Sequence, residues 1–515
     1  MPSTAFQWLS LVGIIWLQSI TGTNTNFPAY SSQLKQLLSI SQIQLNNLAF
    51  ASDAGKLFGF LSGLASIYLP LWLVLMIGST LGLVGYGVQY LFITNHISSL
   101  SYWHVFFLTV LAGNSICWIN TVCYVITIRN FPSDRQVAVG ITTSYQGLSA
   151  KVYTTIVDVV GHKKRAITFL FLNSVLPLLV SLIATPLVRE IEVISPKHRR
   201  IGFDVIFAIT IVTGIYAIMS SLEFVSNKIS SLGSLIGISV SLLIPLLVPL
   251  SMMIVGSWHK TTEKQKVYNF TVEDGHNEKT ENEVKEGEES EESEEVHDIG
   301  IKEEVETKLM LRRLDFWLYF FVYLFGATLG LVFLNNLGQI AESRGYNGTS
   351  SLVSLSSSFG FFGRLMPSII DYFYRENKCA ISKPGYMMVL MAPTAGAFFL
   401  LLNKTDLALY VSTAIIGVCT GAITSIAVSM TTELFGTKNF SVNHNVVVAN
   451  IPVGSLLFGY LAAIVYHKGG NENGKCMGME CYRNTFILWG SLSFFGTFLA
   501  FILHLRTRKF YSHKL

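Results

Sequence analysis

Charged side chains are scarce in this chain, because Asp, Glu, Lys and Arg together make up only 13% of its 515 residues. A soluble protein of this length needs a more polar surface, so the composition excludes a soluble globular fold. Hydrophobic residues account for 51% of the sequence. They gather in repeated runs of about 20 residues, the length of a helix that crosses a hydrocarbon layer roughly 30 Å thick. Lipid offers no hydrogen bonds to a bare backbone, so these runs should be helices packed in a bundle. We therefore predict an all-α, polytopic membrane protein.

Cysteine is also rare, with six residues in the whole chain, too few for a disulfide framework. Three of them, Cys117, Cys123 and Cys419, fall in apolar runs and are predicted to be small core residues. The sequence has no phosphate-cradling glycine-rich motif, no metal-ligand cluster and no hydrolytic triad. These absences argue against an enzyme, a cofactor and ATP-driven transport. The net charge of +4 is spread over short loops rather than gathered in one patch, so we expect no nucleic-acid partner.

The one long polar stretch, residues 259–314, interrupts the apolar pattern with a dense acidic run, Glu286–Glu295. Low hydrophobicity and dense like charge leave such a segment unable to bury enough surface to fold. We predict a solvated, mostly disordered cytoplasmic loop. It is either a plain tether between two membrane bundles or a regulated loop that binds a cytoplasmic partner.

The apolar runs number about fourteen, arranged as six, a pair and six. An N-terminal bundle within residues 1–188 contains Phe6–Ile20, Asn46–Tyr68, Leu71–Ile93, Val105–Ile128, Val137–Val160 and Ala166–Val188. The extra pair, within residues 189–258, comprises Gly202–Leu222 and Leu232–Trp258. A C-terminal bundle within residues 315–505 contains Phe316–Leu337, Leu352–Tyr372, Tyr386–Leu402, Leu407–Met430, Val446–Val465 and Phe486–Leu505, and a basic tail, residues 506–515, follows. The first run is either a cleaved signal peptide or a retained helix, and the lack of a basic leading region favours the helix.

Lys and Arg in the short loops set the predicted orientation. The basic residues of Arg189–Arg200 and Arg506–Lys509 place both chain ends and the acidic loop in the cytoplasm, although His162–Arg165 would then face outward. In this scheme two sequons, at Asn347 and Asn403, lie in outer loops and are predicted glycosylation sites. Either the plasma membrane or an endomembrane, such as that of the vacuole or the endoplasmic reticulum, fits this pattern.

Two cysteines, Cys476 and Cys481, share one predicted outer loop, Lys468–Arg483. Four intervening residues, including Gly478, allow the chain to turn back on itself. An extracellular or lumenal setting permits oxidation. We predict a disulfide between them, with two free thiols as the alternative.

The two bundles contain a short repeated sequence. The segment Phe58–Phe60, in the second helix of the first bundle, has the same sequence as Phe359–Phe361, in the second helix of the second bundle. Equivalent positions in two six-helix halves favour duplication over chance similarity. Repeated halves with a site at their midplane interface are the physical basis of alternating-access transport.

Four stretches carry a family resemblance: Asn26-Phe-Pro-Ala-Tyr-Ser-Ser-Gln-Leu-Lys35, Gln44-Leu-Asn-Asn-Leu-Ala-Phe-Ala-Ser-Asp-Ala-Gly-Lys-Leu-Phe-Gly59, Asn130-Phe-Pro-Ser-Asp-Arg-Gln136 and Ser144-Tyr-Gln-Gly-Leu-Ser-Ala-Lys151. With them the chain resembles the plant nodulin-like branch of the major facilitator superfamily, the group that includes the nuclear-fusion-defective proteins. The resemblance covers nearly the whole chain and implies the major facilitator fold, with two six-helix bundles rocking about a central cavity, and secondary transport.

The chain departs from the usual facilitator pattern in two ways. Gly59-Phe-Leu-Ser-Gly63 keeps the glycines of the loop signature after the second helix but lacks its Asp and its basic pair. The extra helix pair goes beyond twelve helices. The degenerate signature and the acidic loop support an alternative function, a transport-inactive membrane receptor or scaffold that uses that loop.

Ionisable side chains within the predicted helices are the candidates for a site, because each costs from about 2.5 kcal/mol upward in hydrocarbon. Asp53 and Lys56 lie three residues apart and share one helix face. They either neutralise each other as an internal pair or face the cavity, where the carboxylate could carry a coupling proton and the ammonium could bind an anion. Lys151 has no acid within one turn and should seek a water-filled cavity, a substrate carboxylate or a partner such as Asp53.

Arg364 has a planar fork suited to two-point contact with a carboxylate or phosphate. Its position resembles that of a substrate-binding arginine in facilitators that carry oxalate and monocarboxylates, although it could also snorkel to the inner boundary. Tyr145 and Gln146 are plausible polar lining. The resemblance places Lys56, Lys151 and Arg364 on helices that line the interface between the bundles. We therefore predict a gradient-driven secondary transporter of a small, anionic organic solute, with protons as the coupling ion at Asp53.

Overall fold

The computed structural model describes residues 3–161, 164–191, 199–221, 229–253, 303–346, 348–374, 382–470 and 476–512, and every regular element in these ranges is helical. The N-terminal half consists of six rods: α1 (Ser3–Thr21), α3 (Gln42–Ala54) continued by α4 (Gly59–Tyr68), α5 (Leu71–Ile93), α6 (Tyr102–Asn130), α7 (Arg135–Val160) and α8 (Arg165–Ala184). A short 3-10 turn (Phe27–Ala29) and α2 (Ser31–Leu38) join the first two rods. The extra pair is α9 (Arg199–Met219) and α11 (Ser231–Leu243), whose rod continues to Met253.

The C-terminal half repeats the count of six. Its rods are α14 (Leu314–Tyr323) continued by α15 (Leu329–Ser343), α16 (Thr349–Tyr374), α17 (Lys383–Leu400), α18 (Asp406–Phe435), α19 (Phe440–Val448) continued by α20 (Asn450–Gly454) and α21 (Tyr460–Lys468), and α22 (Arg483–Ser512). A short helix, α13 (Thr307–Met310), precedes the first of them. The predicted all-helical arrangement of six, a pair and six is thus present.

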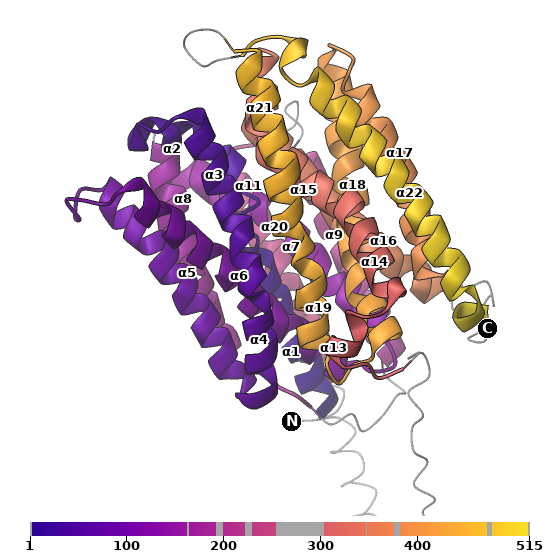
Figure 1. Cartoon of the computed structure of the whole chain (residues 1–515). Coiled ribbons are helices and arrows are strands. Elements are labelled where there is room, and N and C mark those ends of the chain that lie inside the picture. The colour runs from indigo at the N-terminus through magenta and orange to yellow at the C-terminus, as the bar shows by residue number, and fades with distance from the viewer. Residues whose placement is uncertain are drawn as a thin grey trace, which may run out of the picture.

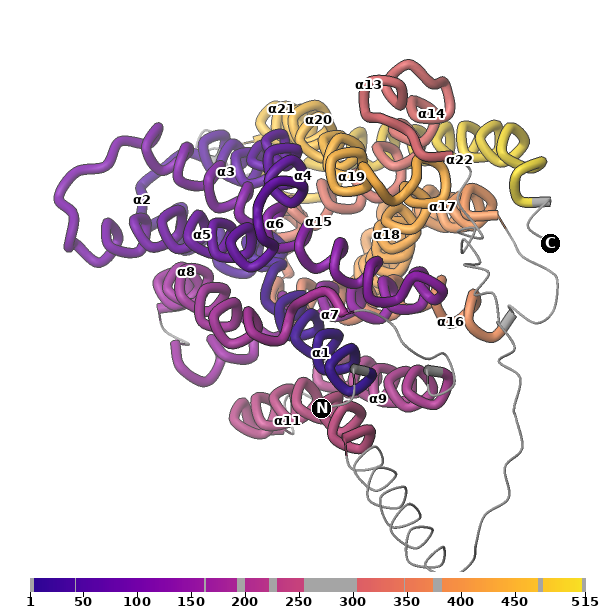
Figure 2. The backbone as a smooth tube through the Cα atoms, turned by 90° about the horizontal axis from the view of Figure 1, so that it is seen from below, coloured from indigo at the N-terminus to yellow at the C-terminus, as the bar shows by residue number. Residues whose placement is uncertain are grey.

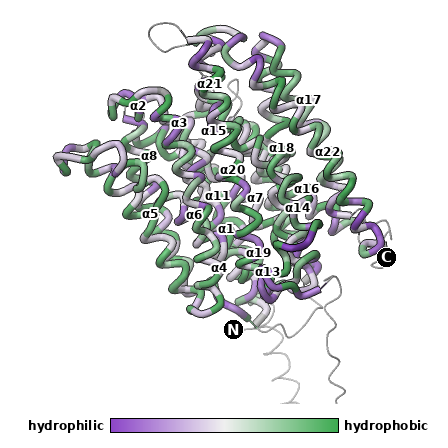
Figure 3. Tube along the Cα trace, in the orientation of Figure 1, coloured by the Kyte–Doolittle hydropathy of each residue, from purple (hydrophilic) through white to green (hydrophobic). Residues whose placement is uncertain are grey.

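This chain is an integral, multi-pass membrane protein. In the described ranges, nine helices are each long and apolar enough to cross a membrane. Hydrophobic residues cover most of the helix lengths, and hydrophilic ones gather toward the helix ends (Figure 3). The rods outside those nine include α7 and α16, which carry many hydroxyl side chains and are largely buried by other helices. A helix that faces protein rather than lipid can be more polar.

Two helix boundaries differ from prediction for identifiable reasons. The second rod begins at Gln42 rather than at the predicted Asn46, because Ser41 and Gln44 form a capping box that satisfies the first backbone N–H groups. The fifth rod of the C-terminal half begins at Phe440 rather than Val446. Its first turns, Ser441–Asn445, are too polar to read as a membrane helix, but they lie against other helices of the protein.

The last helix extends beyond its predicted end at Leu505 into the basic tail. The last rod, α22, continues as helix to Ser512 and includes Arg506, whose Nε donates to Asp315 Oδ1 at 2.7 Å. A lysine or arginine in the last turn of a helix complements the partial negative charge of its carbonyl end. The basic residues therefore extend the helix past the hydrophobic stretch.

Both chain ends lie at the same end of the molecule, and the turn that leads into α22 lies at the opposite end (Figure 1). In the view from below, the two halves sit side by side, and α9 and α11 pack next to α1 and α7 (Figure 2). The pair also touches the C-terminal half, because α9 contacts α16 as well as α7. The extra helices therefore cover one side of the boundary between the halves.

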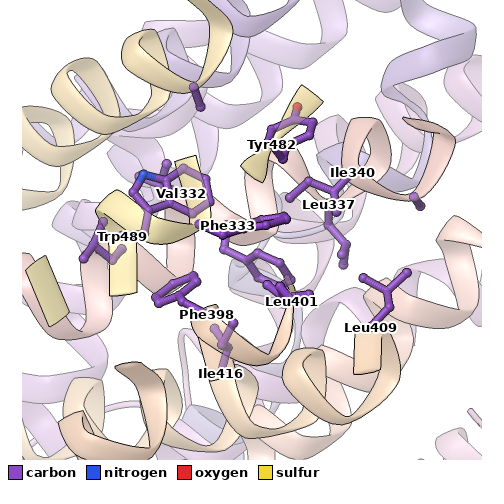
Figure 4. Packing of buried hydrophobic residues seen from close by; sticks show 14 of the residues in the cluster. Val332, Phe333, Leu337, Ile340, Phe398, Leu401, Leu409, Ile416, Tyr482 and Trp489 are labelled. Atoms are coloured by element: carbon purple, nitrogen blue, oxygen red, sulfur yellow. The ribbon is translucent and has the colours of Figure 1, made fainter. Parts of the chain in front are cut away.

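One of two hydrophobic core clusters in the described part of the C-terminal half lies near the end that carries the disulfide. Phe333, Phe398 and Trp489, from three different rods, are fully buried there. The rings of Phe398 and Trp489 lie edge to face with centroids 5.7 Å apart, and Figure 4 shows Leu401 among the neighbouring aliphatic side chains. Edge-to-face packing is the favoured geometry for aromatic pairs, and it fixes how these rods meet.

Glycine allows several helix pairs to approach closely, as in many membrane bundles. A Cβ atom added at Gly113 on α6 would lie 1.8 Å from the carbonyl oxygen of Ser52 on α3, and one added at Gly363 on α16 would lie 2.0 Å from that of Val418 on α18. Because the obstacles are backbone atoms, no side-chain rotation relieves the clash. These contacts hold α3 against α6 and α16 against α18. Residues of α3, α6 and α16 belong to the candidate site.

We expect Gly113→Leu to prevent α6 from docking on α3 and to abolish recovery of folded protein. The matched control is Gly396→Ala, because a Cβ there meets nothing within 4 Å. In that exposed helical position alanine should raise stability by about 0.5–1 kcal/mol. The measurement is the yield of monodisperse protein and its thermal unfolding midpoint. Equal yields for the two variants would contradict the packing described here.

The acidic stretch lies outside the described residues up to residue 302, but the segment that follows it is anchored. The Glu304 carboxylate accepts hydrogen bonds from the backbone N–H groups of Thr437 and Lys438, at 2.9 and 3.0 Å, in the turn between α18 and α19. The Val305 N–H donates to the Phe435 carbonyl at 3.0 Å, and Val305 is fully buried. The chain therefore leaves the acidic stretch attached to the base of α19.

Candidate solute site between the two halves

The Asp53 carboxylate joins the two halves of the molecule. Its Oδ1 lies 2.6 Å from the Lys56 ammonium on the same rod. Its Oδ2 accepts hydrogen bonds from Ser455 Oγ at 2.6 Å and from Asn335 Nδ2 at 3.0 Å, both in the C-terminal half. Asp53 is 2% exposed and Lys56 is 6% exposed. The buried charge is thus neutralised by one partner and hydrogen-bonded by two others, as a buried ion pair requires.

Two irregular segments meet at this cluster. The rod that carries Asp53 and Lys56 turns through a 3-10 segment, Gly55–Phe58. Ser455 begins a π-helical segment, Ser455–Gly459, between α20 and α21. Such interruptions inside long helices often mark functional positions, and here they bring side chains of both halves to one carboxylate.

A central cavity lies next to this cluster and is lined by both halves. It holds about 90 Å³ of space accessible to water, enough for several water molecules. The polar residues that line it are Asn24, Thr25, Lys56, Asn120, Thr121, Tyr124 and Gln146 from the N-terminal half and Tyr323, Arg364, Thr424, Ser441, His444 and Asn445 from the C-terminal half. Of the five predicted substrate-binding residues, Lys56, Gln146 and Arg364 are brought together here.

Arg364 is the cation of this cavity that has no carboxylate partner among the described residues. Its Nε is buried without a hydrogen-bond partner. It projects from α16 beside Gly147 of α7, where a Cβ would lie 2.8 Å from one guanidinium nitrogen. Two tyrosines, Tyr124 and Tyr323, line the same cavity. A guanidinium in this setting is available for a carboxylate or phosphate to bind by two parallel hydrogen bonds.

Aromatic side chains from both halves, Phe440 and His444 on α19 and Tyr124 on α6, form a wall of the cavity. His444 on α19 stacks on Phe440 with centroids 5.2 Å apart, and its ring meets that of Tyr124 edge to face at 5.6 Å. The His444 Nδ1 lies 3.3 Å from Thr431 Oγ1. These contacts fix the imidazole as part of the cavity surface. The sequence reasoning missed His444 because its predicted helix began two residues later.

Polar contacts join the two halves on either side of the cavity. At the end that holds the chain termini, Ser441 Oγ donates to the Gly63 carbonyl at 3.2 Å and Asn445 Nδ2 donates to Thr121 Oγ1 at 2.9 Å. At the other end, Ser32 Oγ donates to Glu342 at 2.6 Å, and the Asp53 cluster lies beneath. Two sets of hydrogen bonds therefore cross between the halves, one toward each end of the molecule.

Comparison with known proteins identifies the family. The nodulin-like family model matches residues 7–254, and the model described as NFD4, C-terminal domain, matches residues 298–513. Protein NUCLEAR FUSION DEFECTIVE 4 of Arabidopsis thaliana is 38% identical over 531 aligned positions that cover 99% of this chain and 90% of the relative. This chain belongs to the nodulin-like family. Its N-terminal motifs predicted that membership correctly.

Solved structures with the same fold include two whose descriptions name oligopeptide or peptide transporters. The tetrameric PepTSo2 matches with a TM-score of 0.52 at 11% identity over 99% of this nodulin-like chain and 100% of the other. A structure of the peptide transporter POT matches with a TM-score of 0.54 at 13% identity, over 99% and 96% of the two chains. A study of proton dependent oligopeptide transporters supplies a third, with a TM-score of 0.55 at 10% identity over 98% and 99%. At such identities the likeness shows the fold alone, the major facilitator arrangement.

Lys151 lies outside the central cavity of this nodulin-like protein. Its Nζ donates to the Ser220 carbonyl at 2.9 Å, at the carbonyl end of α9. A cation at that end of a helix satisfies a free carbonyl and complements the helix dipole. Tyr145 also faces α9, with its hydroxyl 3.5 Å from Thr210 Oγ1. Neither residue is among those that line the central cavity, and neither partner could be identified without knowing where the extra pair docks.

We expect Lys151→Met to leave the affinity for a ligand of the central cavity within about twofold of wild type and to lower the stability by about 1–2 kcal/mol, the value of a partly buried charge at a helix end. Methionine keeps the length of the side chain but cannot donate to the Ser220 carbonyl. The matched variant is Ser358→Ala, because Ser358 Oγ donates to the Ala217 carbonyl near the same end of α9. Transport kinetics and thermal unfolding are measured together. Loss of transport at unchanged stability would contradict this expectation and would indicate that Lys151 takes part in the solute site.

The cysteine pair and Asn403, two of the predicted modification sites, lie at the end of the molecule opposite the chain termini. Cys476 and Cys481 form a disulfide, and both are buried beside the hydrophobic core of the C-terminal half. Asn403 is exposed in the turn between α17 and α18, so the position is open to a glycan. Asn347 lies outside the described residues. Glycosylation at either sequon stays a prediction.

Proposed function

We propose that this protein is a gradient-driven secondary transporter that carries a small, anionic organic solute by alternating access. The observation that carries the proposal is the buried Arg364, which has no carboxylate partner among the described residues and lines a cavity between the two halves. Burying a charge without a partner is costly. A bound carboxylate would supply that partner. The peptide transporters that share the fold support transport as the activity class.

Alternating access requires contacts that can break at one end of the cavity while they hold at the other. The two sets of hydrogen bonds between the halves can break separately, since each is a small group of polar contacts. Breaking the Ser441 and Asn445 contacts would open the cavity toward the end with the chain termini. Breaking the Ser32 and Asp53 contacts would open it toward the other end. Rocking of two such halves around a fixed site is the mechanism typical of repeated folds.

Asp53 is the proposed coupling group. Protonation would remove the negative charge that pairs with Lys56, and would weaken the bonds from Ser455 and Asn335 that cross between the halves. Lys56, freed from its partner, would then offer a second cation to a solute anion, because it lines the central cavity. One proton would in this way link anion binding to the opening of one end.

The test is uptake by purified protein in proteoliposomes with and without an imposed pH gradient. A thermal-shift screen against carboxylates, amino acids, phosphates and neutral sugars first selects the solute. A ligand at 100 times its dissociation constant stabilises the folded state by about 2.7 kcal/mol. We expect a carboxylate to give the largest shift of the unfolding midpoint. We also expect an inwardly directed proton gradient to concentrate that carboxylate inside the vesicles. Concentration of a neutral sugar, with no response to carboxylates, would overturn the proposal.

A further inference from the structure

Two residues of the central cavity each bury a polar atom that has no hydrogen-bond partner in the described part of the chain. They are Arg364, through Nε, and Asn120, through Oδ1. Arg364 belongs to α16 in the C-terminal half, and Asn120 belongs to α6 in the N-terminal half. A buried polar group that stays unsatisfied costs free energy, and an exception in a native fold calls for an explanation. A bound solute can supply both missing partners.

The two atoms require opposite hydrogen-bonding groups on that solute. The Arg364 nitrogen is a donor and needs an acceptor, for which a carboxylate is the strongest match to a guanidinium. The Asn120 oxygen is an acceptor and needs a donor, such as a hydroxyl, an amide N–H or an ammonium. The solute should therefore carry a carboxylate and a hydrogen-bond donor, one directed at each half of the protein.

The charges around the cavity decide which donor fits. Lys56 is already neutralised by Asp53, and no acidic residue belongs to the described lining of the cavity. An ammonium beside Asn120 would thus have no carboxylate to pair with, and it would add positive charge beside Arg364. A neutral hydroxyl satisfies Asn120 without that penalty. The aromatic wall of Tyr124 and His444 offers apolar contact to the body of the solute.

We propose that the cavity selects a small monocarboxylate that carries a neutral hydrogen-bond donor, such as a hydroxy acid. This inference rests on the proposed function and names its substrate class. A carboxylate on Arg364 and a hydroxyl on Asn120 bind the two halves at once. Occupancy by such a solute therefore favours the closed arrangement of the two halves, whereas a plain carboxylate engages only one half.

The test is counterflow exchange in proteoliposomes loaded with lactate, at equal pH on both sides. External lactate is compared with propionate, which lacks the hydroxyl, pyruvate, which replaces the donor by an acceptor, and alanine, which replaces it by an ammonium. A site built to hydrogen-bond a hydroxyl discriminates strongly against analogues that lack it. We expect lactate to exchange at least about tenfold better than each of the other three.

Two substitutions at Asn120 sharpen the test. Asn120→Leu removes the acceptor at similar size, so lactate and propionate should exchange equally well. Asn120→Asp supplies a carboxylate, so alanine should gain at least about tenfold relative to lactate. Within each variant, the ratio of two solutes corrects for differences in the amount of folded protein.

Equal exchange of lactate and propionate by the wild type would overturn this inference and leave the proposed function standing. Faster exchange of pyruvate than of lactate would show that the amide N–H of Asn120 faces the solute, and it would overturn the assignment of a donor. No exchange of any of the three carboxylates, in protein with a normal unfolding midpoint, would count against the proposed function itself.

Discussion

Arg364→Ala should lower the specific uptake of a carboxylate at least about 100-fold, which corresponds to about 2.8 kcal/mol of lost binding free energy. The guanidinium lines the central cavity and has no carboxylate partner among the described residues. Water replaces a lost partner poorly in such a setting, because interactions between charges are stronger at low dielectric constant. Arg364→Lys should recover only about a tenth of the wild-type value, since an ammonium cannot reproduce the two parallel bonds of the fork.

The control for Arg364 is Arg508→Ala, which makes the same chemical change at an exposed position near the end of α22. It should leave uptake unchanged. A second control uses the neutral amide of the transported acid, whose weak binding should be similar in wild type and in Arg364→Ala. Full carboxylate uptake by Arg364→Ala at a normal unfolding midpoint would show that the site does not depend on this cation.

Asp53→Asn should abolish the response of uptake to an imposed pH gradient, while exchange at equal pH on both sides continues. Asparagine keeps the shape of the side chain but cannot take up the coupling proton. The substitution also leaves Lys56 buried without its partner, and breaking a buried ion pair on one side costs about 3–5 kcal/mol. We therefore expect a large loss of stability as well as the loss of coupling.

The double variant Asp53→Asn/Lys56→Met separates these two effects, because it removes both charges at once. It should regain most of the lost stability and still fail to respond to the gradient. The control is Asp158→Asn, an acid whose partner, Arg165, is 2.6 Å away at a more exposed position. That variant should keep its coupling. Gradient-driven uptake by the double variant would exclude Asp53 as the proton site.

The fold was largely predictable because helix length and hydropathy are local properties of the sequence. The third rod, for example, was predicted at Leu71–Ile93 and is observed at the same residues. The predictions failed where a helix is polar because it faces protein. Ser441–Asn445 looked like a loop, but the segment forms the first turns of α19 against α4 and α6. Hydropathy reports how readily a side chain enters an apolar environment. It therefore cannot recognise polar helical turns that are buried by other helices of the protein.

The candidate site was predictable in part. The spacing of Asp53 and Lys56 correctly placed both groups on one helix face, and the structure pairs them. The contacts of Asp53 with Asn335 and Ser455, about 280 and 400 residues further along the chain, depend on how the halves dock. The same limit applies to Lys151, whose partner is the end of a helix in the extra pair. A local pattern identifies a buried charge, whereas its partner follows from tertiary packing.

The measurement that tests the central claim most directly is protection of the Cys117 thiol from chemical labelling by a bound solute, because Cys117 lines the central cavity. In a variant with Cys123, Cys379 and Cys419 replaced by serine, and with Cys476 and Cys481 in their disulfide, Cys117 is the one remaining thiol. We predict that lactate at ten times its dissociation constant slows the reaction of Cys117 with N-ethylmaleimide about tenfold. In Arg364→Ala the same lactate concentration should have no effect. Unchanged labelling of Cys117 at lactate concentrations that saturate transport would contradict a solute site between the two halves.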